Sequence, residues 1–158
     1  TIQPQNRTST ITGIHTYDGA RPSAHAGQSV TLTLSDDIDI SRGDWINSGA
    51  TPAQVDKLRA ADVCWFAEEP MALGRKYLIK HGTRTAPARI NTVDYQLDIH
   101  TLDEHNNAHH LEMNGIARVQ LQLQQALPID AYANIKTGGA FILIDEVSNQ
   151  TVAGGMFA

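Results

Sequence analysis

The chain has 158 residues, of which 41% are apolar and 18% charged, and its formal net charge is −5. This composition predicts an ordinary globular protein with a buried core, and it excludes a disordered or fibrous chain. The acidic balance argues against a dedicated nucleic-acid surface, and these residues contain neither a bilayer-spanning apolar run nor a secretory leader.

Alternation of apolar and polar residues dominates the chain, and this period of two is typical of half-buried β-strands. It is clearest where Val119, Leu121 and Leu123 alternate with glutamines, so these three side chains are expected to point inward. Turn signals such as Asn114-Gly115 separate the segments. In chain order, strands are expected over residues 9–15, 30–34, 61–67, 77–81, 84–90, 93–99, 119–123, 139–145 and 151–157.

Two of these segments carry more specific expectations. The alternation over residues 93–99 predicts that Val93, Tyr95, Leu97 and Ile99 face the core. The run at residues 140–144 is continuously apolar, which predicts a central strand buried on both faces, with Phe141 fully buried.

One short helix is expected over residues 52–59, because Thr51 suits the capping position and Pro52 the first helical position. It follows the polar segment Asn47-Ser48-Gly49. The boundary between two modules is therefore expected here.

Two segments are distinctive in their residue order: Asp37 to Asp44 and the run Glu68-Glu69-Pro70. Both resemble the GTPase-type large subunit of sulfate adenylyltransferase, a relative of translation elongation factors. Further motifs in the same order lie at residues 16–19, 24–32, 74–80, 93–98, 111–119, 137–145 and 151–156. The resemblance runs from about residue 11 to the last residue, with departures at residues 108–110 and 136–139.

This resemblance implies an all-β fold made of translation-factor-like antiparallel barrels. Residues 1–47 are expected to form part of a second-domain barrel, residues 48–59 a linker, and residues 60–158 a complete six-stranded Greek-key barrel. The absence of an initiator Met at Thr1 fits an excised fragment.

The parent enzyme, by the same resemblance, converts ATP and sulfate to adenylyl sulfate and pyrophosphate on a separate small subunit, coupled to GTP hydrolysis. The sequence lacks both the phosphate-binding Gly-x-x-x-x-Gly-Lys-Ser/Thr loop and a guanine-reading motif. GTP and magnesium are therefore expected on a domain outside this chain, which is expected to hold no catalytic, cofactor-binding or metal residue. It is expected to serve as a non-catalytic scaffold and coupling module.

Its expected partners are the small catalytic subunit, the GTPase domain of its own polypeptide, and a second copy paired through unpaired strands of the first barrel. No membrane or nucleic-acid partner is expected. Cys64 is the sole cysteine, so no internal disulfide forms, and the cytoplasm is the expected location. Two alternatives remain open: a translation-factor fragment that binds aminoacyl-tRNA, and a free-standing ligand-binding barrel.

Further groups of residues are candidates for metal binding or for acid–base chemistry. A histidine cluster predicts a solvated hairpin loop rather than a metal site, because adjacent strand residues point to opposite faces; its members are His100, His105, His109 and His110. Paired carboxylates, expected at turns and on the surface, occur at Asp36-Asp37, Glu68-Glu69 and Asp145-Glu146. The Glu68-Glu69 pair has a second interpretation, as a contact to a partner.

Three further expectations concern packing and charge. Cys64 is expected to be a buried, inert thiol, and Trp45 and Trp65 are expected to pack in the core or between barrels. A basic strip is interpreted as a mixed-charge outer face rather than a tRNA-binding surface; it comprises Arg75, Lys76, Lys80, Arg84 and Arg89.

Overall fold

A computed structural model describes residues 1–105 and 110–158. The chain divides into two compact units, Thr1–Pro52 and Ala53–Ala158, and each is described here by itself. Almost all regular structure is β-strand, as the sequence predicts. Among the described residues, no helix is long and apolar enough to cross a membrane.

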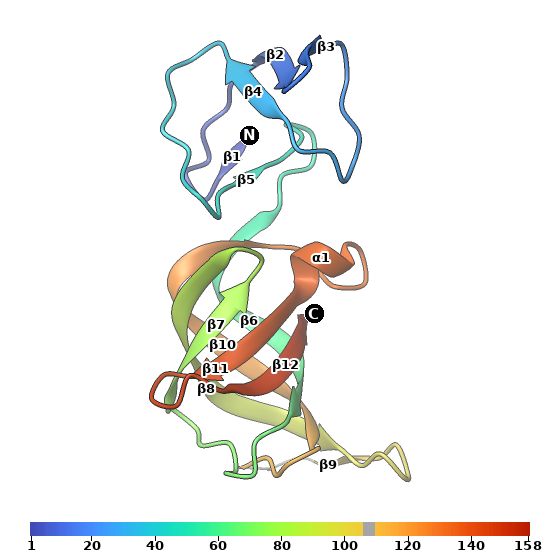
Figure 1. The fold of residues 1–158 in the computed structure, drawn as a ribbon. Coiled ribbons are helices and arrows are strands. Elements are labelled where there is room, and N and C mark those ends of the chain that lie inside the picture. Colours follow the sequence, from blue (N-terminus) through green and yellow to red (C-terminus); the bar gives the residue numbers. More distant parts are fainter. Residues whose placement is uncertain (106–109) are drawn as a thin grey trace. The chain divides into compact units, whose positions relative to one another are not determined.

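The second unit is a closed antiparallel barrel of six strands (Figure 1). These strands are β6 (Gln54–Trp65), β7 (Lys76–His81), β8 (Arg84–Leu97), β10 (Ile116–Ile129), β11 (Ala140–Asp145) and β12 (Thr151–Phe157). Their order around the barrel is β10-β6-β12-β11-β7-β8, and pairing of β8 with β10 closes it. Closure gives every strand two hydrogen-bonded neighbours, so the barrel presents no open edge.

The inward face of each barrel strand supplies the core. Val119, Leu121 and Leu123 of β10 are all at most 1% exposed, which confirms their predicted orientation. Phe141 of β11 is also buried, and its ring centroid lies 4.5 Å from that of Phe157 on β12. Neighbouring β12 uses Gly155 opposite the Phe141 ring, because a Cβ there would lie 2.2 Å from the ring.

The helix predicted over residues 52–59 is wrong, because residues from Gln54 onward belong to β6. Pairing with β10, which places Val55 opposite Pro128, overrides the local helical signals. Strand structure therefore extends into the segment expected to be a linker. The one helix described is instead the four-residue α1 (Lys136–Gly139).

A close backbone approach explains the glycine in α1. A Cβ at Gly139 would lie 2.3 Å from the Tyr132 Cα, so only glycine fits there without displacing the chain. The neighbouring Gly138 carbonyl accepts a backbone hydrogen bond from Asp130 (3.1 Å) and lies 2.9 Å from the Nε2 atom of the buried His81.

Two orientation predictions also need correction. In β11, Phe141 and Leu143 are buried, whereas Ile142 and Ile144 on the outer face are only half-buried, because a barrel strand has a single interior face. In β8, Val93 packs against the core, but Tyr95 lies outside, where the Arg118 guanidinium sits 5.7 Å from its ring centroid. Register shifts between β8 and β10 break the alternation in this part of the strand. Ile99, which is also predicted to face the core, lies beyond the end of β8 and is 57% exposed.

The first unit contains two small sheets. One pairs β1 (Ile2–Gln3) with β5 (Trp45–Ile46), and the other has the order β3-β2-β4, with β3 (Gly19–Arg21), β2 (Ile11–Thr16) and β4 (Thr31–Leu34). Only Ile2 and Gln3 are buried in this unit, and Trp45 is half-buried. Strand β4 pairs with β2 alone, so one of its edges is open. These two small sheets accompany the closed barrel, in line with the predicted all-β fold class.

Candidate functional site

The loop between β6 and β7 and the turn between β11 and β12 lie at one end of the barrel, and α1 lies at the other end (Figure 1). Together the loop and turn surround a hollow of about 590 Å³, here called the end pocket. Its lining includes Glu68, Glu69 and Pro70, the run that carries the family resemblance.

Two buried aromatic residues anchor the floor of the end pocket. Trp65 at the end of β6 and Tyr77 in β7 meet edge to face, with ring centroids 5.6 Å apart. The Trp65 indole N–H donates to the Glu69 carbonyl (2.8 Å), and the Tyr77 hydroxyl accepts from the Ala72 amide (3.3 Å). Each ring thus anchors one part of the loop through a hydrogen bond. Burial raises the pKa of the Tyr77 hydroxyl.

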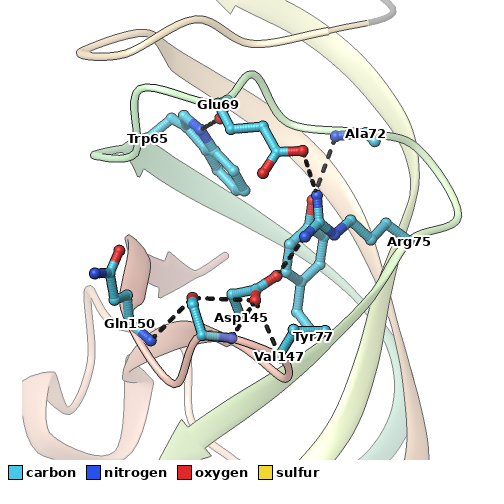
Figure 2. A network of polar contacts seen from close by, with 9 residues as sticks. Trp65, Glu69, Ala72, Arg75, Tyr77, Asp145, Val147 and Gln150 are labelled. Carbon is cyan, nitrogen blue, oxygen red and sulfur yellow. Dashed lines mark hydrogen bonds and ion pairs between the residues drawn. The ribbon is translucent and has the colours of Figure 1, made fainter.

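Arg75 connects the loop to the turn (Figure 2). Its Nη1 atom lies 2.8 Å from Glu69 Oε1, and its Nη2 atom lies 2.6 Å from Asp145 Oδ2. The guanidinium also lies 5.8 Å from the centroid of the Tyr77 ring. These contacts, the Glu69 hydrogen bond first among them, raise the pKa of Arg75 above its usual value.

The Asp145 carboxylate organises the turn. Its Oδ1 atom accepts hydrogen bonds from the Ser148 amide (2.8 Å), the Val147 amide (3.0 Å) and the Ser148 hydroxyl (3.1 Å). The Ser148 amide contributes most to a lowered pKa of Asp145, and the Arg75 charge adds to it. Asp145 is therefore a charged structural acceptor, with its side chain only 8% exposed.

The rim of the end pocket presents apolar side chains to solvent. Phe66 is 48% exposed and Val147 is 87% exposed, although both lie beside a rigid, hydrogen-bonded frame. Exposed apolar residues around a preformed hollow are typical of protein-docking sites. The ionisable groups Glu69, Arg75 and Asp145 of the frame pair with one another. The arrangement suits the binding of a partner.

The structure separates the carboxylate pairs that the sequence joins. Glu69 and Asp145, which are far apart in sequence, meet at Arg75. Their sequence neighbours do not join this contact: Glu146 pairs with Lys76 (2.8 Å), and Glu68 lines the end pocket without a described ion pair to Arg75. The spacing of the carboxylates gives no signal of this convergence. Only the Glu68-Glu69 interpretation as a contact to a partner pointed toward the site.

Asp36 lies in the first unit. Its carboxylate accepts hydrogen bonds from the hydroxyls of Ser9 (2.6 Å) and Ser35 (2.8 Å). These bonds, the one from Ser9 first, lower the pKa of Asp36. Asp36 and Asp37 are both exposed, so this pair carries surface charge, as the sequence predicts.

The histidine cluster falls partly outside the described residues, since His109 is not among them. His100, His105 and His110 are exposed, and His110 lies 3.5 Å from Glu112. Within residues 1–105 and 110–158, no three His, Cys, Asp or Glu side chains converge as metal ligands would. Cys64 is only half-buried rather than buried, because the alternation that turns Val63 and Trp65 inward turns Cys64 outward.

The basic strip divides between two surfaces. Arg75 points into the end pocket, whereas Lys76 and Arg89 lie opposite each other on the outer face of the β7–β8 hairpin. Lys80 is exposed on the same face of β7.

A family model described as "GTP-eEF1A C-terminal domain-like" matches residues 59–158. The chain belongs to this family. The fold agrees: a solved structure of Sup35 complexed with GDP superposes with a TM-score of 0.85, covering 99% of this chain and 39% of that one. At 19% identity, that likeness shows the fold alone.

Curated relatives of this family member carry more specific names. The chain is 40% identical over 155 residues to sulfate adenylyltransferase subunit 1 of Saccharophagus degradans, covering 98% of this chain and 33% of the relative. It is 41% identical over 157 residues to the subunit of the same name in Aliarcobacter butzleri, covering 99% of this chain and 33% of the relative.

A third relative is the bifunctional enzyme CysN/CysC of Rhodopirellula baltica, which is 43% identical over 157 residues, covering 99% of this chain and 24% of the relative. The resemblance to sulfate adenylyltransferase large subunits is therefore confirmed. The chain spans about a third of the length of the subunit 1 relatives.

Proposed function

We propose that this chain is the barrel region of the GTP-dependent regulatory subunit of a sulfate adenylyltransferase. It serves there as a non-catalytic scaffold that docks the small catalytic subunit and the GTPase domain of its own polypeptide. The observation that carries the proposal is 40% identity to a subunit 1 relative across 98% of the chain. GTP and magnesium bind outside these residues, and the complex works in the cytoplasm.

The end pocket supports the docking role. Its frame is rigid before any partner binds, because Arg75 bridges Glu69 and Asp145 from two separate segments. Preorganisation of this kind lowers the entropy lost on association. Phe66 and Val147 supply apolar contact area at the rim, so the small subunit is proposed to bury these two side chains.

Binding to the small catalytic subunit from the same source tests this proposal. The unchanged chain is expected to bind the immobilised subunit saturably. Replacing Phe66 and Val147 together by Asp is expected to weaken binding about tenfold or more, since both changes place a charge in an apolar contact. Both side chains are exposed, so the barrel is expected to keep its melting temperature.

Ile135→Asp is the matched control, because Ile135 is 50% exposed, directly precedes α1 and does not line the end pocket. It is expected to leave the affinity unchanged. Absence of binding by the unchanged chain, or equal losses in control and double variant, would contradict the assignment of the end pocket.

The isolated chain is also proposed to dimerise through the first unit. Strand β4 hydrogen-bonds to β2 alone, and Val30, Leu32 and Leu34 are only half-buried beside its open edge. A second copy can add its own strand there. Light scattering during size-exclusion chromatography should give twice the 17.2 kDa chain mass at high concentration, and Leu32→Lys should lower it. A strict monomer at every concentration would contradict the dimer.

A further inference from the structure

A second hollow, of about 520 Å³, is lined by residues of β6, β7, β8 and β10. We call it the cationic hollow. Its apolar lining consists of the half-buried Pro87 and of the buried Ala88 and Leu123, whose side chains belong to the barrel core. Its rim consists of cations and amides: Lys57, Lys76, Arg89, Gln122 and Gln124.

The strand register explains why these side chains converge. Lys76 of β7 lies opposite Arg89 of β8, and Arg89 lies opposite Gln122 of β10. The pairing of β10 with β8 ends at Leu123, and the pairing of β10 with β6 shifts register directly after Gln122. Register shifts of this kind mark β-bulges, which recur beside binding sites. The strand register of the barrel therefore brings the lining residues of the cationic hollow together.

The charges around the cationic hollow are only partly compensated. Lys76 lies 2.8 Å from Glu146 and is neutralised by it. The Arg89 guanidinium donates to the Gly74 carbonyl (3.0 Å), which orients it without cancelling its charge. The Lys57 ammonium lies within 4.0 Å of no carboxylate in the part of the chain that the structure describes, and no acidic residue lines the hollow.

We propose that the cationic hollow binds an acidic segment of a partner protein. A carboxylate of that segment accepts hydrogen bonds from Arg89 and Lys57, and an apolar side chain beside it contacts Pro87. The Gln124 amide, which is exposed, bonds to the peptide backbone. Planar guanidinium groups recognise carboxylates in two-point contacts, which makes Arg89 the specificity-determining residue.

The same observations disfavour a nucleic acid as the occupant. The chain has a net charge of −5, whereas nucleic-acid surfaces carry an extended basic excess. No aromatic side chain lines the cationic hollow, so bases would find no ring on which to stack. This inference goes beyond the proposed function, since it concerns another surface and does not depend on the identity of the complex.

Fluorescence anisotropy with a labelled, glutamate-rich peptide carrying a central leucine tests the proposal on the full chain. Saturable binding is expected, weakening as salt screens the charges. The same peptide with glutamine in place of glutamate should bind at least about tenfold more weakly. The double variant Lys57→Gln/Arg89→Gln should lose affinity for the acidic peptide by about tenfold as well. Both side chains are exposed, so its melting temperature should match that of the unchanged chain.

Lys80→Gln/Lys136→Gln is the matched control, since it removes the same charge from exposed positions that do not line the hollow. It should change the affinity less than about twofold. Equal losses in the two double variants would overturn the proposal, because they would show unspecific attraction. So would an absence of saturable binding, or tighter binding of a single-stranded oligonucleotide than of the peptide. If the double variant fails to fold, Lys57→Gln alone provides the same comparison.

Discussion

The two units use the same kind of strand yet differ sharply in burial. In the barrel unit, every strand from β6 to β12 except the two-residue β9 (Glu104–His105) adds buried residues to one core. In the first unit, five strands bury only Ile2 and Gln3. The difference lies in closure, because the barrel sheet returns on itself through β8 and β10 while the first unit has open edges. Strand content alone therefore does not make a core.

Removing the Phe141 ring should have the largest effect on the free energy of unfolding. It tests the difference in burial between the two units. Phe141→Ala should lower the free energy of unfolding by about 3–5 kcal/mol, through lost transfer energy and a residual cavity beside Phe157. Ile11→Ala in the first unit should change it by less than about 0.5 kcal/mol, because Ile11 is 47% exposed. Urea unfolding of both variants measures the difference. A nearly unchanged midpoint for Phe141→Ala would show that β11 is not central to the core.

Adding one methyl group to the barrel should have the next largest effect. At Gly155 a Cβ would lie 2.2 Å from the Phe141 ring, so Gly155→Ala should cost about 1–3 kcal/mol of stability. Gly49 in the first unit has no atom within 4 Å of such a Cβ, so Gly49→Ala should be neutral. Thermal unfolding compares the two variants. Equal shifts in melting temperature would contradict the proposed difference in packing between the two units.

Acidification should act on the barrel through His81. Burial lowers the pKa of His81 below 6.5, opposed by its contact with the Gly138 carbonyl and by the charge of Asp130. Below pH 6.5 the unfolded chain gains a proton that the folded chain resists, so stability should fall as the pH decreases from 6.5 toward the folded pKa. The effect should be smaller than either core substitution.

His81→Gln should flatten the dependence of unfolding free energy on pH between 7.5 and 5.5. His15→Gln, at an exposed position of the first unit, is the control for the loss of a histidine. If both variants keep the full slope, another group is responsible.

Nucleotides should have no effect on either unit. The sequence contains no phosphate-cradling loop, and calorimetry with GTP or ATP in the presence of magnesium should show no heat beyond dilution. Micromolar binding would place a nucleotide site on the barrels and contradict the assignment of domains.

Much of the barrel was predictable because its signals are local. Val119, Leu121 and Leu123 alternate with glutamines, and that period alone gives both strand and orientation. The start of β6 was not predictable, because Thr51 and Pro52 are sound helix signals and only pairing with β10 decides for a strand. The prediction that Ile142 and Ile144 are buried is wrong, because a continuous apolar run does not show whether one or both faces of the strand are buried.

The candidate site was less accessible from sequence than the fold. Arg75 and Asp145 are 70 residues apart, and their contact arises from the pairing of β7 with β11. Their spacing in the sequence does not predict this contact. The adjacent carboxylates alone predict surface charge. The single sequence feature that led to the site was the Glu68-Glu69-Pro70 run, which matches a family and not a chemical pattern.

Amide hydrogen exchange on the full chain tests the contrast between the units most directly. Backbone amides in β6, β10 and β12 should exchange only through global unfolding of the barrel, with one shared free energy. Amides of β2 and β4 should exchange orders of magnitude faster, because the first unit has only two buried residues to stabilise its sheets. Equal protection of β4 and β10 would contradict the account, since it would mean that the first unit is as stable as the closed barrel.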